Sequence, residues 1–466
     1  MIVPFELDPS QPVPIYRQIY QRFCECIADG RLRPGDRVPA VRALAAELNL
    51  ARGTVDAAYQ LLIGEGYLIA RGAAGTVVTP QLAPVASPTH RAPVASTTHQ
   101  AAHCGALPLA LQIGLPALDA FPRKLWTRLA GRQLRQAGLE GLVYPDSRGY
   151  APLRSAIASY LGISRGITCH PDQVFVCAGY RACLDLISHT LMRQGDTCWL
   201  EEPGYFMARN ALLEAGAQLV PVPVDDQGLN VAQGIARAPD AGFAVVTPTH
   251  QSPLGVSLSL PRRFALLDWA NRQGSWIIED DYDSEYRYQG KPLPALKSLD
   301  QQGRVLYTGT FSKVLFPGLR LAYLVVPAEQ NQAFARQADR LHNHCPHLLQ
   351  ATVAAFLNEG HFARHLKKMR TLYARRRQWL VDALHQQFGD RLQISAQVGG
   401  MHLVVGLCEG NDIELAQRAR AAGIAVEPLS RWYLEAKPRH GLVLGFTNIT
   451  CVEQASIAAL RLAEIM

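Results

Sequence analysis

The sequence predicts an α/β protein in two parts, a small helical unit with a β-ribbon followed by a large α/β part. Three observations carry this prediction. Apolar residues recur with a helical period as far as Gly64, and a glycine-rich alternation follows. A stretch rich in proline, alanine, serine and threonine comes next. From residue 109 onward, helical stretches alternate with short apolar strands, which is typical of a sheet with helices on both faces.

Length and composition limit the class of protein. A chain of 466 residues with 48% hydrophobic and 18% charged residues is typical of a folded protein with two or three domains. The sequence has no apolar run of the ~18 residues that span a membrane, and its N-terminus lacks the pattern of a secretory signal. The ten cysteines include no CxxC pair, which argues for reduced thiols and against a zinc site. We therefore expect a cytoplasmic protein with no membrane partner and no metal.

The first helical unit covers residues 1–78. Apolar residues four apart mark the buried face of a first helix, and two further clusters mark a second and a third helix; these residues are Ile15, Ile19, Phe23, Ile27, Val41, Leu44, Ala45, Leu48, Val55, Tyr59 and Leu62. The segment YLIARGAAGTVV then alternates around glycines, as a two-stranded ribbon does. Three helices and a ribbon predict a winged helix-turn-helix.

A winged helix reads DNA with the N-terminal end of its third helix. That end carries Arg52, Gly53 and Thr54, whose side chains suit a phosphate, a guanine edge or a thymine methyl. Arg42 begins the preceding helix, and Gly75 shapes the tip of the wing. This unit has as many acidic residues as arginines, so any contact with DNA must come from placed arginines. A protein-interaction module with solvated arginines is the alternative.

Residues 79–108 are predicted to form a linker, because they lack an apolar period and contain two near-repeats of APVAS. Residues 109–466 form the large part. Six apolar segments are expected strands, namely 174–177, 198–201, 243–247, 276–279, 305–308 and 321–326. From about residue 345 we expect a smaller α+β domain, with a basic helix at 365–377 that is either a solvated face or a contact surface for DNA or a second subunit.

Several side chains of the large part suit one cofactor. Lys313 follows a strand, and both Thr310 and Arg320 can bind a phosphate. Asp280 follows an apolar strand, at the end where α/β sheets bind ligands, and Tyr282 lies two residues further on the same side. A lysine that forms a Schiff base and a carboxylate that holds a pyridine nitrogen are what pyridoxal 5′-phosphate requires.

Three further segments complete this predicted site. Gly179, Tyr180 and Arg181 lie between a strand and a helix, where backbone N–H groups form a phosphate cup. Tyr205 is the candidate for stacking on the ring, and Tyr144 is expected to reach the phosphate of a neighbouring subunit. Each segment is weak evidence alone, and their combination favours pyridoxal phosphate.

The whole chain resembles the MocR/GabR-type regulators. PIYRQI, GRLRPGDRVPAVRALA, RGTV and AYQLLIGEGYL occur in the order of a GntR-type winged helix, and TGTFSKVLFPGLRLAY resembles the lysine segment of a class I aminotransferase. The resemblance implies a fold-type I pyridoxal-phosphate domain with Lys313, Asp280, Tyr282 and Arg320 in the cofactor roles. It also implies a homodimer in which the winged helices are swapped between subunits.

Four positions depart from these families. Ala40 and Ala51 replace the small hydroxyl residues that GntR-type domains usually carry. Ser252 replaces the asparagine that binds the ring hydroxyl in aminotransferases, and the strand segment Leu442–Phe446 lacks their carboxylate-binding arginine. Because an unpaired carboxylate in a pocket costs several kcal/mol, efficient amino-acid turnover is not expected.

Two arginines offer a substitute carboxylate site. Arg431 resembles the arginine that grips an effector carboxylate in GABA-responsive relatives, and Arg209 can assist it. A surface location for both is the alternative.

These observations predict a transcription regulator that binds an operator in double-stranded DNA and senses an amino compound, or pyridoxal phosphate itself. A working aminotransferase with an accessory DNA-binding domain is the second hypothesis, and whether any turnover remains is left open. A DNA-binding scaffold without cofactor is disfavoured because the cofactor set is complete. The sequence does not give the effector, the operator or the sign of regulation.

Overall fold

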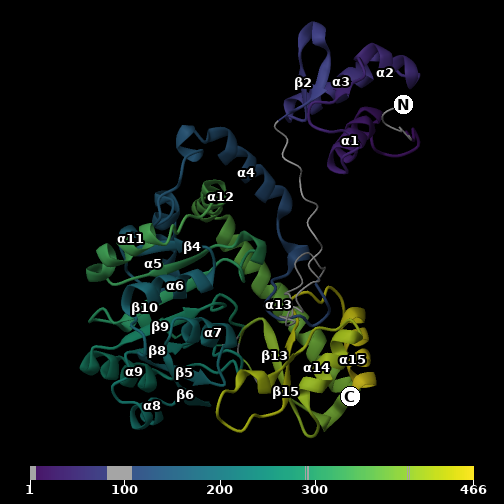
Figure 1. The fold of residues 1–466 in the computed structure, drawn as a ribbon. Helices are drawn as coiled ribbons and strands as arrows, with labels where there is room; N and C mark the ends of the chain where they lie inside the picture. The colour runs from purple at the N-terminus through teal and green to yellow at the C-terminus, as the bar shows by residue number, and fades with distance from the viewer. Residues whose placement is uncertain (1–6, 81–107, 289, 291–292, 396, 398) are drawn as a thin grey trace. The chain divides into compact units, whose positions relative to one another are not determined.

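The computed structural model describes residues 7–80, 108–288, 290, 293–395, 397 and 399–466. The chain forms two compact units, residues 1–105 and 106–466, which are drawn in Figure 1. Residues 81–107, which make up most of the predicted linker, lie outside the described residues, so the linker stays a prediction. Among the described residues, no helix is long and apolar enough to cross a membrane.

The first unit is the predicted winged helix-turn-helix. Its three helices are α1 (Ile15–Ala28), α2 (Val41–Glu47) and α3 (Arg52–Gly64). The ribbon consists of β2 (Leu68–Ala70) and β3 (Thr76–Val78), which are antiparallel. A third strand that the sequence did not reveal, β1 (Arg37–Val38), pairs with β3 and makes a three-stranded sheet. Two residues give no period from which a strand can be predicted.

The apolar faces of the three helices meet in one small core. Ile19, Phe23, Val55 and Leu62 are fully buried there. The ring of Tyr59 contacts Phe23 edge to face, with 5.5 Å between centroids, and its hydroxyl donates a hydrogen bond to the Pro39 carbonyl at 2.8 Å. Burial on this scale explains why a short unit with balanced charges holds its shape.

The second unit is built on a mixed sheet of eight strands in the order β4-β11-β10-β9-β8-β5-β6-β7. The neighbours from β10 to β6 are parallel, and β11, β4 and β7 add antiparallel edges. The strands are β4 (Val174–Cys177), β5 (Thr197–Glu202), β6 (Gln218–Asp225), β7 (Gly228–Leu229), β8 (Phe243–Val246), β9 (Trp276–Asp281), β10 (Val305–Thr310) and β11 (Ala322–Val325). All six expected strands are present within two residues at each end.

Strand β6 was missed because its sequence, QLVPVPVD, contains two prolines. Pro221 and Pro223 lie opposite Leu200 and Glu202 of β5, close to the edge of the sheet. A proline cannot donate to the ladder, so it is tolerated where one side of the strand is not fully paired.

Helices cover both faces of the large sheet, as Figure 1 shows. One face of the sheet packs against α6, α7 and α11. One part of the other face packs against α8 and α9, and another part packs against α5, α12 and α13. Neighbouring residues such as Ile277 and Ile278 are buried on opposite faces, which explains the continuous apolar runs. The helices are α4 (Arg123–Gln136), α5 (Ala151–Arg165), α6 (Tyr180–Leu191), α7 (Phe206–Glu214), α8 (Val231–Arg237), α9 (Leu260–Gln273), α10 (Leu296–Leu299), α11 (Asn331–Arg340), α12 (His347–Asn358) and α13 (His361–Phe388).

The smaller α+β domain contains an antiparallel sheet, β12-β13-β15-β14, with α14 and α15 beside it. Its elements are β12 (Leu392–Ile394), β13 (His402–Leu407), α14 (Asp412–Ala421), β14 (Glu427–Pro428), β15 (Gly441–Gly445) and α15 (Val452–Ile465). The predicted basic helix is the first half of α13; Met369 and Tyr373 bury one side of it, and Lys367 and Lys368 are exposed on the other.

Candidate cofactor site and DNA-binding surface

A cavity of 430 Å³ opens at the carboxyl ends of the sheet strands, beside the small domain. It brings together most of the residues predicted for the cofactor, although they are spread along the chain from Tyr180 to Arg320. The lining includes Gly114, Tyr180, Arg181, Tyr205, Phe206, Ser252, Asp280, Tyr282, Thr310, Ser312, Lys313, Arg320, His402 and Trp432. Parallel strands end at one edge of a sheet, and this explains why residues so far apart converge there.

Lys313 lies three residues beyond the end of β10 and reaches into this cavity. Its Nζ donates a hydrogen bond to the carbonyl oxygen of Gly114 at 2.8 Å. A Cβ atom on Gly114 would lie 2.9 Å from that nitrogen, so the lysine occupies space that a side chain would take. Burial lowers the pKa of Lys313, and the nearby carboxylates of Asp283 and Asp280 offset part of this effect. A lowered pKa makes the unprotonated amine, which is the nucleophile, more accessible.

Asp280 is the penultimate residue of β9 and is buried. Burial, together with the charge of Asp281, raises the pKa of Asp280 to about 8. Ionisation of a buried carboxyl group costs free energy unless a cation faces it. A protonated pyridine nitrogen is such a cation.

Arg320 and the N-terminus of α6 form an anion-binding corner. Arg320 has a left-handed backbone conformation (φ 49°), and its Nη2 donates to the Ala178 carbonyl at 2.9 Å. Gly179 precedes α6 with φ 100°, and a Cβ atom on it would lie 2.8 Å from Arg320 Nη2. Thr310, at the end of β10, also lines the cavity. Free N–H groups at a helix start, a guanidinium and a hydroxyl suit a phosphate.

Two predicted residues lie differently from the others. The guanidinium of Arg181 contacts Asp185 at 2.8 Å and Glu214 at 2.5 Å, so its backbone N–H is what it can offer to a phosphate. Tyr144 is 92% exposed and is absent from the lining of this chain's cavity. Tyr205, in contrast, lines the cavity, where its ring lies 5.9 Å from that of Trp432 and 6.3 Å from that of Tyr180.

The structure adds residues around Tyr282 that sequence reasoning missed. His250 Nδ1 lies 3.1 Å from the Tyr282 hydroxyl and 3.2 Å from Asp283 Oδ2. Ser252 lines the same cavity as Tyr282 and offsets part of the rise that burial causes in the pKa of Tyr282. His402, on β13, has its ring 5.7 Å from that of His250. His250 belongs to the segment THQSPLG, in which the sequence alone indicated only a missing asparagine.

The two candidate effector arginines lie near each other beside the same cavity. The Arg431 guanidinium lies over the Phe206 ring, 4.7 Å from its centre, and Phe206 lines the cavity. Arg209 donates to the Tyr433 carbonyl at 3.2 Å. Burial and the positive charge of Arg431 lower the pKa of Arg209. Two guanidinium groups that repel each other are a favourable place for a carboxylate.

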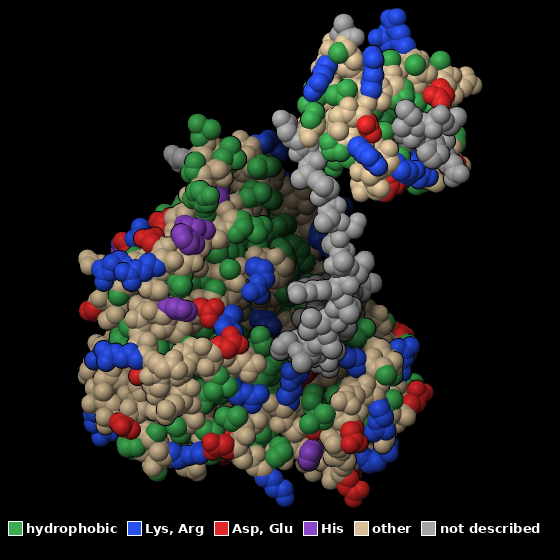
Figure 2. Space-filling model, in the orientation of Figure 1, with side chains coloured by type: hydrophobic (Ala, Val, Ile, Leu, Met, Phe, Trp, Pro, Cys, Tyr) green, Lys and Arg blue, Asp and Glu red, His purple; other side chains and the backbone are tan. Residues whose placement is uncertain are grey.

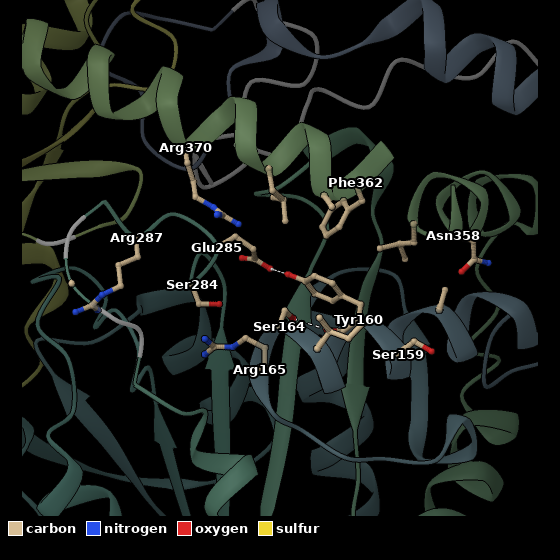
Figure 3. A pocket seen from close by; sticks show the side chains of 16 residues that line it. Ser159, Tyr160, Ser164, Arg165, Ser284, Glu285, Arg287, Asn358, Phe362 and Arg370 are labelled. Atoms are coloured by element: carbon tan, nitrogen blue, oxygen red, sulfur yellow. Dashed lines mark hydrogen bonds between the residues drawn. The ribbon is translucent and has the colours of Figure 1, made fainter. Parts of the chain in front are cut away.

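A second cavity, of 590 Å³, lies between α5, α12, α13 and the loop after β9 (Figure 3). Tyr160 donates to Glu285 at 2.9 Å inside it, and Arg165 forms an ion pair of 2.7 Å with Asp281 at its edge. Burial raises the pKa of Glu285 to about 7. Arg370 points toward Glu285 in Figure 3. Among the residues that the structure describes, the lining of this cavity contains no lysine.

In the winged helix, the predicted DNA-contacting residues lie on the surface. Arg42 and Arg52 are exposed at the starts of α2 and α3, and Gly53 and Thr54 follow Arg52 in the first turn. Gly75 has φ 88° and lies at the turn between β2 and β3.

Arg37, on β1, is a candidate contact that sequence reasoning missed. A Cβ atom on Gly75 would lie 2.8 Å from its Nε, so its guanidinium packs against the wing. The position of Arg37 at the wing depends on the pairing of β1 with β3, and no local sequence pattern predicts that pairing.

Comparison with known proteins identifies both parts of the chain. Residues 15–78 match the model of the gntR family of bacterial regulatory proteins, and residues 117–442 match that of class I and II aminotransferases. The chain is 38% identical over 455 residues to the probable rhizopine catabolism regulatory protein MocR of Rhizobium meliloti, covering 95% of this chain and 92% of that protein. The chain belongs to the MocR-type transcription regulators.

A second regulator and a solved aminotransferase structure are also similar to this chain. The pyridoxine biosynthesis transcriptional regulator PdxR of Corynebacterium glutamicum is 33% identical over 448 residues, covering 95% of this chain and 94% of PdxR. The crystal structure of LysN, an α-aminoadipate aminotransferase from Thermus thermophilus complexed with N-(5′-phosphopyridoxyl)-L-leucine, is 29% identical with a TM-score of 0.70. It covers 77% of this chain and 91% of LysN.

This MocR-type regulator therefore combines a DNA-binding GntR domain with a fold-type I aminotransferase-like domain, and its cofactor is pyridoxal phosphate. The cavity fits that group on its own evidence. It has a corner at Gly179 and one at Gly114 where a Cβ atom would meet Arg320 or Lys313, a buried lysine, and a buried carboxyl, Asp280, that forms no ion pair among the described residues. The regulator function is favoured over that of an aminotransferase with an accessory domain, because whole-length relatives are named as regulators.

Proposed function

We propose that this regulator senses an amino compound, or pyridoxal phosphate itself, in the cavity around Lys313 and responds by changing its affinity for operator DNA. One observation carries the proposal. Most of the side chains predicted to hold the cofactor line the cavity, whereas β15, where aminotransferases place their carboxylate-binding arginine, is apolar along its whole length. A site that binds the amine of a ligand without binding its α-carboxylate is better suited to sensing the ligand than to converting it.

The residues of this chain divide the work of holding the cofactor. When bound, pyridoxal phosphate supplies an aldehyde that condenses with primary amines and a ring that withdraws electrons. Lys313 is the Schiff-base residue, Asp280 faces the ring nitrogen, and Tyr282 faces the ring hydroxyl. The phosphate is held at the start of α6 and by side chains around it, and the ring is stacked on an aromatic residue; these are Gly179, Tyr180, Arg181, Thr310, Arg320 and Tyr205.

The effector is proposed to carry a carboxylate at some distance from its amino group. Arg209 and Arg431 lie beside the cavity and are not among its lining residues. An effector whose amine reaches Lys313 would therefore have its opposite end near these arginines. An amino acid with the amine at the far end of a short chain satisfies both contacts. A carboxylate that pairs with two arginines is bound more tightly than a carboxylate that pairs with one solvated cation.

DNA is proposed to be held by the exposed face of the winged helix. Arg52, Gly53 and Thr54 enter the major groove with α3, and Arg42 clamps the backbone beside it. Gly75 lets the tip of the wing approach the backbone closely.

The regulator is proposed to act as a domain-swapped homodimer. Apolar side chains gather on the surface at the end of α4 and in the segment after it (Figure 2). Leu139, Leu142 and Val143 are 82, 76 and 65% exposed, and Tyr144 adjoins them. A contiguous apolar patch of this kind marks a protein interface, and a second copy would carry Tyr144 toward its neighbour's cofactor.

The alternative function, an active aminotransferase, is supported by the presence of both Lys313 and Asp280 in the lining of the cavity. Steady conversion of an amino donor into a keto acid, abolished in Lys313→Ala, would support it.

The experiment that tests the proposal measures the same preparations in two ways. The absorbance of the cofactor is followed while γ-aminobutyrate, β-alanine or n-butylamine is added, and affinity for DNA from upstream of the gene is measured with and without each. We expect the amino acids to perturb the spectrum and the DNA affinity, n-butylamine to act more weakly, and Arg431→Ala to remove that difference. Equal DNA affinity and unchanged DNA geometry in every condition would disprove sensing.

A further inference from the structure

The contact between His250 and Tyr282 limits what the Tyr282 hydroxyl can do. A phenolic oxygen can accept two hydrogen bonds and donate one. His250 Nδ1 lies 3.1 Å from this oxygen. If His250 donates to it, the Tyr282 proton is free to point toward the cavity that Tyr282 lines. Which atom of His250 carries the proton therefore decides what Tyr282 can do.

Two observations place that proton on His250 Nδ1. Asp283 Oδ2 lies 3.2 Å from Nδ1, the Asp283 side chain is 1% exposed, and neither of its oxygens has a hydrogen-bond partner among the described residues. A buried carboxylate without donors is costly, so it draws a proton to the nearest nitrogen. The other ring nitrogen, Nε2, is buried without a partner among the described residues, and an N–H there would be unsatisfied.

The surroundings of His250 keep this arrangement in place. A Cβ atom on Gly400 (φ 87°) would lie 2.0 Å from His250 Cε1, so the start of the small domain closes over the imidazole. His402 lies beside it, with 5.7 Å between the two rings, and burial lowers the pKa of His402 to about 4, so that His402 is neutral. The other titratable groups that influence this cluster are Lys313, Asp280 and Glu201.

We propose that the His250–Asp283 pair is a positioning device that makes Tyr282 a permanent hydrogen-bond donor to the phenolic oxygen of the bound cofactor. Asp283 holds the proton on His250 Nδ1, His250 donates it to Tyr282, and Tyr282 donates its own proton to the cofactor. The inference rests on the assignment of Tyr282 to the ring hydroxyl in the proposed function.

This device has a measurable consequence for the Lys313 Schiff base. A donor to the phenolic oxygen stabilises its negative charge, which is no longer balanced once the Schiff base loses its proton. Tyr282 therefore favours the deprotonated form and lowers the pKa of the Schiff base. Without the Nδ1–H group, Tyr282 is free to turn its proton toward Asp283, and the pKa of the Schiff base rises.

The test is a pH titration of the cofactor absorbance in the full-length holoprotein, because the two protonation states absorb at different wavelengths. We compare His250→Leu, which removes the donor, with His250→Asn, whose amide nitrogen occupies nearly the position of Nδ1. We expect the Schiff-base pKa to rise by about one unit in His250→Leu, a tenfold change in proton affinity, and to stay near the native value in His250→Asn. Both variants remove the imidazole and keep Asp283, so neither volume nor charge explains a difference between them.

A double-mutant cycle with Tyr282→Phe completes the test. If His250 acts through Tyr282, His250→Leu has no further effect in the Tyr282→Phe protein. An unchanged pKa in His250→Leu, an equal rise in His250→Asn, or an equal rise in the Tyr282→Phe background would each overturn the proposal. If Tyr282→Phe itself leaves the pKa unchanged, the assignment of Tyr282 in the proposed function fails first. Should His250→Leu not fold, His250→Gln replaces it, because its amide reaches the position of Nε2 and is expected to behave like leucine.

Discussion

The guanidinium group of Arg320 lies directly against the Cα atom of Gly179. A Cβ atom at that glycine would approach Arg320 Nη2 to 2.8 Å and Cζ to 3.0 Å. Gly179 also has φ 100° and ψ 171°, a backbone conformation that is essentially limited to glycine. Both the space and the backbone angle therefore require glycine at the start of α6, where the phosphate of the cofactor is expected.

Replacing this glycine should weaken cofactor binding. Gly179→Ala moves the Arg320 guanidinium and strains the helix start, and we expect the affinity for pyridoxal phosphate to fall by about tenfold to hundredfold, equal to ~1.4–2.8 kcal/mol. Titration of the apoprotein with the cofactor, followed by absorbance, measures this. Gly195→Ala is the matched control, because Gly195 has φ 88° but meets only Gln218, at 3.9 Å. Equal losses in both variants would show that backbone strain alone is responsible.

The buried carboxyl of Asp280 should make the stability of the apoprotein depend on pH. Its pKa is raised to about 8 by burial, whereas an unfolded aspartate has a pKa of ~3.9. The folded state therefore binds the extra proton between these values, and the free energy of unfolding falls as pH rises through that interval. Relative to Asp280→Asn, we expect the apoprotein to lose about 1.4 kcal/mol per pH unit between about pH 5 and 7.

Urea unfolding of both proteins across this pH range provides the measurement. Adding pyridoxal phosphate should remove the difference, because its protonated ring nitrogen then faces the carboxylate. Glu285, whose pKa burial also raises to about 7, titrates in both proteins and cancels in the comparison. Parallel pH profiles for the two apoproteins would contradict the prediction.

Arg52 should contribute to DNA binding in one of two distinguishable ways. If it contacts a phosphate, Arg52→Ala weakens binding to all sequences and reduces the slope of log affinity against log salt by about one. If it contacts a guanine, the loss is ~1–3 kcal/mol and is confined to the operator. Fluorescence anisotropy at several salt concentrations separates the two. Arg31→Ala should bind normally, since Arg31 is paired with Asp29 at 2.6 Å; an equal loss there would point to bulk charge.

The apolar patch after α4 should hold the dimer together. We expect the double variant Leu139→Asp, Leu142→Asp to have half the native molar mass by light scattering, because two carboxylates cannot be buried unpaired in an interface. Its affinity for pyridoxal phosphate should also fall, since Tyr144 of a second copy would no longer be present. Ile457→Asp, at a half-exposed position of α15, is the control and should stay dimeric. A native mass in the double variant would place the interface elsewhere.

Local patterns predicted most of the fold. The buried residues of α1 and α3 follow a period of 3.6, and the six strands found in advance are continuous apolar runs that end in glycine or polar residues. The strands that were not predicted are β1, β6 and β7 and, in the small domain, β12, β13 and β14; all of them except β13 are very short or interrupted by proline. Their pairing depends on neighbours in space, for which a local pattern carries no information.

The candidate site divides in the same way. Lys313, Asp280 and Arg320 were predictable because each lies in a segment with its own chemistry, at the end of a strand. His250 and Asp283 were not, because their relationship depends on a 3.2 Å contact between two loops, closed by Gly400 from the small domain. The roles of Arg181 and Tyr144 also depend on where their side chains point, and sequence spacing does not specify that.

By itself, the sequence determined the two parts of this protein, the order of its strands and helices, and the chemical identity of its cofactor-binding groups. Local periodicity and residue type specify these features, and both act over only a few positions of the chain. Tertiary structure alone decided which of the charged groups are paired, how strongly burial shifts Asp280, and which proton Tyr282 can give. Those properties depend on desolvation and on distances between segments far apart in the chain, and they exist only once the sheet and the small domain have come together.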